Sequence, residues 1–240
     1  RGGIMNGVYY TIYNNIRDRD AGVKPVSRPN IPTAEQEYDE IKVPGRDGNL
    51  YRKKGTLKDI PIEITYNFLS DDPEDWAEDF RSIKRRFLKE STGMLMFSDD
   101  PGYYYKVKKI DIGTNERLAK RIGKFQVTFT CEGYMYLIEG AETRNLSDTL
   151  YNAFEECKPV YEIAGDGVCT LTVNGTEVTA NIGGKLVIDT GLKLCYTALK
   201  ETANRRLTGY YEDLYLKEGE NTFSVSPGFT VKIKPNWRCR

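Results

Sequence analysis

Regular alternation of apolar and polar residues dominates the first half of the chain. Residues 60–68 alternate an apolar side chain (Ile, Tyr or Phe) with Pro, Glu, Thr or Asn, and residues 125–131 repeat the pattern. Tyr103, Tyr105 and Val107 give a weaker example. A period of two is typical of a β-strand with one buried face, so the pattern predicts three strands of a sheet.

A helical period separates these strands and predicts a helix over residues 73–89. Asp72 is placed to cap it, and Pro73 stands in the first turn, where a missing N–H costs nothing. Four apolar residues at steps of four, three and four should face the sheet: Trp76, Phe80, Ile83 and Phe87. Cations crowd the last turns, where the helix dipole favours them: Lys84, Arg85, Arg86 and Lys89.

The alternation lapses over residues 139–157, which we interpret as a connector with a short helix near residues 147–154. After Pro159 many short apolar alternations follow, separated by Gly, Asn and Pro. Asn174-Gly175 is the strongest hairpin signal among them, and Gly165–Gly167 indicates a further turn. Repeated short strands of this kind favour a second β-sandwich.

The fold class is therefore predicted to be mainly β, with two domains. Residues 1–138 form an N-terminal β-sandwich with one α-helix, residues 139–157 form the connector, and residues 158–240 form a C-terminal β-sandwich. A chain of 240 residues is long enough to bury two cores without disulfides or metals.

Composition narrows the function classes. Lys plus Arg and Asp plus Glu both total 35, so a strongly basic nucleic-acid-binding surface is not expected to be the main feature. The chain has no histidine, which excludes Ser-His-Asp and Cys-His catalysis and most zinc sites. The cysteines show no ligand spacing and are read as reduced thiols: Cys131, Cys157, Cys169, Cys195 and Cys239. We expect no catalytic, cofactor or metal site.

Several features have a chemical and a plainer interpretation. The pairs Asp71-Asp72 and Asp99-Asp100 both precede proline, so caps and turns explain them better than a glycosidase carboxylate pair. Asp18 and Asp20 beside Gly22 lack the later ligands of a calcium loop. The basic cluster at residues 84–89 is either a phosphate site or, more simply, a solvated helix end. The 17 tyrosines could stack on glycans, although packing and subunit contacts explain them more readily.

The ends of the chain carry few signals. The sequence shows neither a basic start with an apolar run nor an apolar stretch of about 18 residues, so we expect no secretory signal and no membrane helix. The first residue is Arg1, and Met5 is the expected natural start.

The segment Val43-Pro44-Gly45-Arg46-Asp47-Gly48 resembles a turn in the first domain of siphophage distal tail proteins, especially those of phages that infect Gram-positive bacteria. The order of other features is similar to that family along nearly the whole chain. They are Asn6-Gly7-Val8, Leu95 to Pro101, Gly123-Lys124-Phe125, Ile188-Asp189-Thr190, Leu216 to Asn221 and the closing Pro235-Asn236-Trp237-Arg238.

This resemblance implies a structural virion protein and no enzyme. Six copies would form a ring that joins the tail tube to the tail-tip or baseplate hub, and the second domain would be galectin-like. Expected partners are the tail tube protein, the tail-associated hub protein and receptor-binding or baseplate proteins, with neither nucleic acid as the main ligand nor membrane insertion. The expected location is the phage tail, assembled in the bacterial cytoplasm. The alternative is a carbohydrate-binding module that acts in host-surface adhesion.

Two segments are predicted to contact neighbouring subunits. The Pro-rich arm at residues 18–36 is weakly apolar and is expected to pack poorly on its own domain, which nominates Val23, Val26, Pro29 and Ile31. The turn after the strand-like residues 40–43 is expected near the ring lumen or the tube contact and comprises Pro44, Gly45, Arg46, Asp47 and Gly48.

Overall fold

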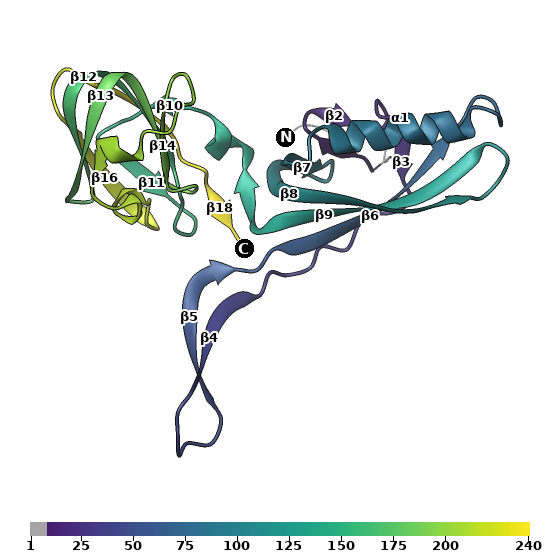
Figure 1. The fold of residues 1–240 in the computed structure, drawn as a ribbon, viewed down its shortest axis with the longest axis horizontal. Helices are drawn as coiled ribbons and strands as arrows, with labels where there is room; N and C mark the ends of the chain where they lie inside the picture. The colour runs from purple at the N-terminus through teal and green to yellow at the C-terminus, as the bar shows by residue number, and fades with distance from the viewer. Residues whose placement is uncertain (1–8) are drawn as a thin grey trace. The chain divides into compact units, whose positions relative to one another are not determined.

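A computed structural model describes residues 9–240, and β-strands predominate in that range (Figure 1). Backbone contacts divide the chain into two units, one that runs to Met135 and includes Arg240, and one from Tyr136 to Cys239. The prediction of a mainly β protein is confirmed. The expected start at Met5 and the Asn6-Gly7-Val8 motif lie outside the described residues.

One large antiparallel sheet and one helix make up most of the first unit. Seven strands follow one another in the order β2-β1-β7-β8-β9-β6-β3, and β4 and β5 form a separate two-stranded sheet. The elements are β1 (Thr11–Tyr13), β2 (Ile16–Arg17), β3 (Val23–Pro25), β4 (Gln36–Lys42), β5 (Asn49–Leu57), β6 (Ile60–Leu69), α1 (Trp76–Lys89), β7 (Gly93–Phe97), β8 (Asp100–Arg117) and β9 (Ile122–Leu137).

The core of the first unit lies between this sheet and α1. The predicted strands at residues 60–68 and 125–131 are confirmed as parts of β6 and β9, which pair along their length from Ile60↔Cys131 to Leu69↔Ile122. Their apolar faces are buried together, because residues opposite each other in a sheet share a face. Ile83 and Phe87 of α1 are buried in the same core. Trp76 and Phe80 are half-buried and both contact the Phe68 ring, which Phe80 stacks on and Trp76 meets at a tilt.

The helix begins three residues later than predicted. The Asp72 side chain accepts a hydrogen bond from the Glu74 N–H at 3.0 Å, and the first helical residue is Trp76. The expected cap at Asp72 is therefore wrong, because this aspartate closes a turn that contains Pro73 before the helix starts. At the other end Arg86 Nη1 donates to the Asp20 carbonyl at 2.8 Å.

The second unit is built around the long pair β12–β13. Strand β12 pairs with β13 on one side and with β16 and β17 on the other. The elements are η1 (Ile138–Ala141), β10 (Arg144–Asn145), β11 (Thr149–Asn152), β12 (Val160–Val173), β13 (Thr176–Asp189), β14 (Leu194–Thr197), η2 (Asn204–Arg206), β15 (Leu207–Thr208), η3 (Tyr211–Leu214), β16 (Gly219–Val225), β17 (Thr230–Lys234) and β18 (Arg238–Cys239).

Glycine residues account for one confirmed prediction and one wrong prediction in the β12–β13 pair. The Asn174-Gly175 hairpin is confirmed, with Val173 opposite Thr176 and φ values of 51° and 83° at the two turn residues. The turn expected at Gly165–Gly167 is wrong, since these residues continue β12 opposite β13. At Gly165 a Cβ would lie 2.5 Å from Cδ1 of Phe229, so the glycine leaves room for this ring.

Residues 139–157, the expected connector, lie in the second unit. Strand β10 pairs with β17, and β11 pairs with β16, so this stretch adds to the β structure of that unit. The short helix expected at residues 147–154 is wrong, because residues 149–152 form β11.

Two motifs near the C-terminus hold turns of the second unit together. Asn221 is fully buried; its Oδ1 accepts from the Lys217 N–H at 2.9 Å, and its Nδ2 donates to the Lys217 and Gly219 carbonyls at 2.8 and 3.1 Å. In the closing motif, Asn236 Nδ2 donates to the Lys158 carbonyl at 2.9 Å, and Trp237 is buried.

Candidate assembly interface

The arm at residues 18–36 packs on its own domain, contrary to expectation. Val23 is only 2% exposed and pairs with Phe68 through β3, Pro29 is buried, and Ile31 packs against the core. Only Val26 among the four nominated residues is well exposed, at 51%. The apolar residues of this segment are used for folding because the short β3 adds to the edge of the large sheet.

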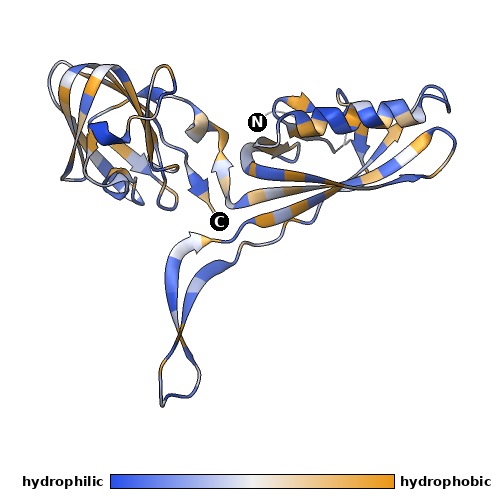
Figure 2. Cartoon of the chain, viewed as in Figure 1, coloured by the Kyte–Doolittle hydropathy of each residue, from blue (hydrophilic) through white to orange (hydrophobic). Residues whose placement is uncertain are grey.

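The element that stands apart from the core is the β4–β5 hairpin. It forms its own two-stranded sheet, and every β5 residue from Asn49 to Thr56 is exposed. Figure 2 shows mostly hydrophilic residues along it. The nominated residues Pro44–Gly48 form its tip, where Gly45 and Gly48 have φ values of 76° and 77°. Glycine adopts this left-handed conformation without steric cost, which explains both glycines of the turn.

One face of the hairpin, which we call the tyrosine face, consists of Tyr38, Glu40, Lys42, Asn49, Tyr51 and Lys53. The rings of Tyr38 and Tyr51 meet edge to face with centroids 6.2 Å apart, and they are 44% and 58% exposed. Glu40 lies directly opposite Tyr51 in the register. Aromatic side chains are enriched in protein interfaces.

The other face carries an apolar pair and an ion network. Ile41 lies opposite Leu50, and both are exposed. The Asp39 carboxylate forms ion pairs with Arg52 (Nη2 to Oδ2, 2.9 Å) and with Lys54 (Nζ to Oδ1, 3.4 Å). The hydrogen bond from Arg52 lowers the pKa of the Asp39 carboxyl. Solvent-exposed ion pairs of this kind contribute little stability. A two-stranded hairpin is marginal by itself, so this one is suited to binding another surface.

The large sheet has two partly open edges. Strand β3 pairs only with residues 66–68 of β6, and the Val26 N–H donates to the Thr65 carbonyl at 2.8 Å. Alternate residues turn their backbone groups to the same side, so Glu63 and Pro61 also face this edge. Between them and residues 30–32 lies an open hollow of about 310 Å³, and Glu63 is exposed.

The second open edge belongs to β8. Strand β7 pairs with β8 only as far as Val107, and β9 lies on the other side. Within residues 9–240, no strand pairs with residues 108–117 on the β7 side. The two open edges therefore lie on opposite sides of the sheet.

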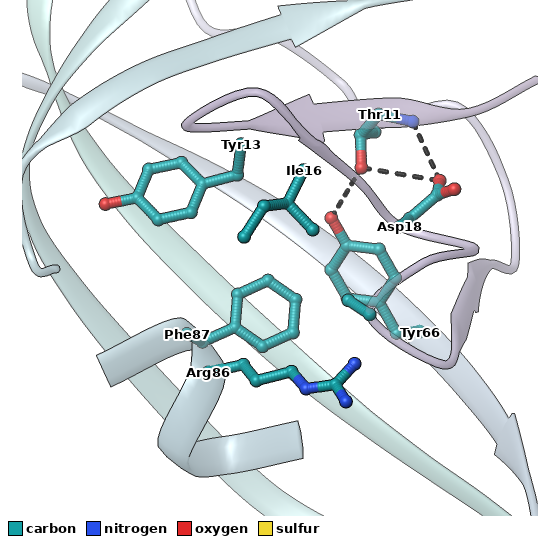
Figure 3. A pocket seen from close by; sticks show the side chains of 8 residues that line it. Thr11, Tyr13, Ile16, Asp18, Tyr66, Arg86 and Phe87 are labelled. Atoms are coloured by element: carbon teal, nitrogen blue, oxygen red, sulfur yellow. Dashed lines mark hydrogen bonds between the residues drawn. The ribbon is translucent and has the colours of Figure 1, made fainter. Parts of the chain in front are cut away.

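A hollow of about 340 Å³, counting its open mouth, lies between the β1–β2 hairpin and α1 (Figure 3). Tyr13, Ile16 and Phe87 supply apolar walls, and Arg86 lies beside them. At its base the hydroxyls of Tyr66 and Thr11 lie 2.8 Å apart, and the Thr11 N–H donates to Asp18 Oδ2 at 2.7 Å. Burial raises the pKa of the Asp18 carboxyl, and hydrogen bonds from the backbone of Thr11 and Arg19 oppose that rise.

The other candidate residues take structural roles where the structure describes them. Asp99 forms an ion pair with Arg28. Burial raises the pKa of the Cys131 and Cys157 thiols to about 12 and about 11. Among residues 9–240 there is no group of three metal-ligating side chains. No helix in the described range is long and apolar enough to cross a membrane.

Sequence reasoning missed the open edges and the hollow. Pro61 was a usable signal, because proline within an alternating strand indicates an edge position. The hollow had no signal, since its walls come from β1, β2, β6 and α1, which meet only in the folded chain.

A family model for the phage tail protein RIFT-related domain matches residues 21–131. The matched residues lie within the first unit. The resemblance to siphophage distal tail proteins is confirmed by this match together with the fold. No curated protein sequence matches the chain.

Solved structures with the same fold cover nearly the whole chain. SPP1 Dit, described as a paradigm of the hub adsorption apparatus in phages that infect Gram-positive bacteria, aligns with a TM-score of 0.63 and 15% identity over 95% of this chain and 98% of its own. A chain of the phage P2 baseplate in its activated conformation with Ca aligns with a TM-score of 0.58 and 10% identity over 98% and 99%. A chain of the same baseplate with Sr aligns with a TM-score of 0.53 and 10% identity, over 95% of this chain and 98% of its own. These structures show the shared fold, and the family match at residues 21–131 supports a structural role in a phage tail.

Proposed function

We propose that this chain is a distal tail protein, six copies of which form a ring that joins the tail tube to the tail-tip or baseplate hub. The proposal is supported by the tail protein domain at residues 21–131 and by the fold of SPP1 Dit over 95% of the chain. The protein acts as a structural adaptor without a catalytic role and assembles in the bacterial cytoplasm before the phage is released.

The open edges of the large sheet carry the argument for a ring. Exposed strand edges must be paired, covered or charged, and those of β6 and β8 offer different residues on opposite sides. Pairing the β8 edge of one copy with the β6 edge of the next repeats one heterologous contact. Such a contact closes into a ring when its rotation closes.

The hairpin supplies a contact beyond the sheet. Its tip at residues 44–48 is exposed and held by two glycines with positive φ, so its shape is defined without any packing on the domain. We assign this tip to the tail tube or the hub protein, which lie above and below the ring in this proposal.

The decisive test removes one backbone hydrogen-bond donor, the Glu63 N–H, from the open edge of β6. In Glu63→Pro the backbone N–H that faces the β6 edge is lost, whereas Glu63→Ala keeps it and removes the same charge. Pro61 already occupies an equivalent edge position, so a proline two residues later is expected to fold.

Native mass spectrometry should show hexamers for the intact chain and for Glu63→Ala, and monomers for Glu63→Pro with an unchanged circular dichroism spectrum. Hexamers that persist in Glu63→Pro would show that this edge is not the contact. An intact chain that stays monomeric, even with tube and hub proteins present, would refute the adaptor function.

A second function, carbohydrate binding, has one observation in its favour. A groove in the second unit is lined by Asn145, Ser147, Asp148 and Phe229, among other residues. Polar groups beside an aromatic ring are suited to a sugar. Glycan-array binding that is lost in Asn145→Ala would support this function, and an array without specific binding would count against it.

A further inference from the structure

The tip of the β12–β13 hairpin carries the dipeptide Asn174-Gly175, which is chemically labile. The backbone nitrogen of Gly175 can attack Cγ of Asn174, because glycine has no Cβ to hinder the approach. The new N–C bond closes a succinimide ring, and the side-chain nitrogen leaves as ammonia with the Gly175 amide proton. Water then opens the ring at either carbonyl, which gives aspartate or isoaspartate.

Two residues of β16, Asn221 and Thr222, hold the Asn174 amide at both ends, and we call them the β16 clamp. The Thr222 N–H donates to Asn174 Oδ1 at 3.0 Å, and Asn174 Nδ2 donates to Asn221 Oδ1 at 2.9 Å. The Asn174 N–H also donates to the Thr222 carbonyl at 2.9 Å. Before Cγ of Asn174 reaches the Gly175 nitrogen, both side-chain hydrogen bonds must break.

The clamp is fixed by its own turn. Asn221 is fully buried, its Oδ1 also accepts from the Lys217 N–H, and its Nδ2 donates to the Lys217 and Gly219 carbonyls. It is therefore not free to follow Asn174 when that side chain turns away. Gly175 is exposed, so water reaches the hairpin tip. The reactants of deamidation are present there, and the clamp opposes the first step.

We propose that Asn174 is a site of spontaneous deamidation and that the β16 clamp sets its rate. The product has lost the Nδ2 donor, so its carboxylate faces Asn221 Oδ1 without a proton between them. Isoaspartate also adds one backbone carbon to a turn that now has φ values of 51° at Asn174 and 83° at Gly175. A modified chain does not re-form the clamp, so each reaction records an opening of this hairpin irreversibly. The site acts in the second unit and does not depend on the proposed ring.

Peptide mass spectrometry of the full chain, aged at mildly alkaline pH, tests the proposal. In urea, Asn174 should deamidate at a rate similar to that of Asn6, which also precedes a glycine. In the folded chain Asn174 should react much more slowly. Asn221→Ala should raise the rate in the folded chain by about tenfold, because one hydrogen bond of the clamp is lost. Asn221→Asp keeps an acceptor oxygen and should retain most of the protection.

Leu171→Ala is the matched control, because it weakens the same core and leaves the clamp in place. Circular dichroism should show both alanine variants folded, and Asn174 should react in Leu171→Ala as slowly as in the intact chain. Equal acceleration in the two variants would show that general unfolding, and not the clamp, exposes Asn174. A folded intact chain that reacts as fast as the chain in urea would refute the clamp. A chain that does not react at Asn174 even in urea would refute the site itself.

Discussion

Two antiparallel hairpins of this protein have similar local pairing and very different surroundings. In the second unit, β12 and β13 are 14 residues each, and β12 has further strands on its other side, so its inward side chains are buried. In the first unit, β5 pairs with β4 alone, and its residues are exposed. Strand pairing by itself therefore buries nothing. The neighbours of a hairpin decide whether its apolar residues stabilise the chain or remain available to another one.

The largest expected difference between the hairpins concerns leucine. Leu171 of β12 is 1% exposed and Leu50 of β5 is 42% exposed. Leu171→Ala should lower the free energy of unfolding by about 2–5 kcal/mol, the usual cost of a cavity in a core. Leu50→Ala should cost less than about 0.5 kcal/mol in the monomer. Urea denaturation measures both, and equal losses would contradict the comparison.

Two asparagines, one in each unit, are also expected to differ in how much they stabilise the fold. The buried Asn221 bonds the backbone of Lys217 and Gly219, whereas the exposed Asn49 donates only to Glu40, at 3.3 Å. Asn221→Ala leaves buried backbone groups without partners and should cost about 2–3 kcal/mol. Asn49→Ala should change the unfolding free energy by less than about 0.5 kcal/mol. If thermal unfolding shifts equally in the two variants, Asn221 does not hold its turn in the way described.

A smaller effect concerns the buried thiols, which the β4–β5 hairpin lacks. Burial raises the pKa of Cys131 to about 12 and that of Cys157 to about 11, above the value of about 8.5 in an unfolded chain. The folded state therefore holds these protons more tightly, and its stability falls as pH rises above about 8.5.

Between about pH 8.5 and 10 each thiol should cost up to about 2 kcal/mol, because one pKa unit corresponds to about 1.4 kcal/mol. Urea denaturation in reductant at both pH values measures the loss. Burial also raises the pKa of the Cys169 and Cys195 thiols, so Cys131→Ala should remove only the part of the loss that one of these four thiols causes. A loss that is unchanged in this variant would show that other groups cause it.

Local periodicity was enough to predict the strands of the first core and the body of α1, because burial on one face imposes period two on a strand and about 3.6 on a helix. It failed where one residue type serves two geometries. Asp72 closes a turn when it was expected to cap the helix, and Gly165 makes room for Phe229 within a strand when it was expected to turn the chain.

The candidate interface was predicted only at the hairpin tip, where Pro44–Gly48 form an exposed turn. The arm was misread because Pro25, Pro29 and Pro32 disrupt any period, and sequence alone does not show that Val23 joins the sheet edge. Open edges depend on strand order, which is a property of the whole sheet. Such features are accessible only after the fold is known.

The central claim, a ring closed by sheet edges, is tested most directly by hydrogen exchange at the Glu63 amide. In the monomer this N–H faces the edge beyond the residues that β3 covers, so it should exchange rapidly, whereas the Ile64 amide on the β9 side should be protected. On assembly, exchange at Glu63 should slow by at least a hundredfold, with Ile64 little changed. Rapid exchange at Glu63 in assembled rings would contradict the account.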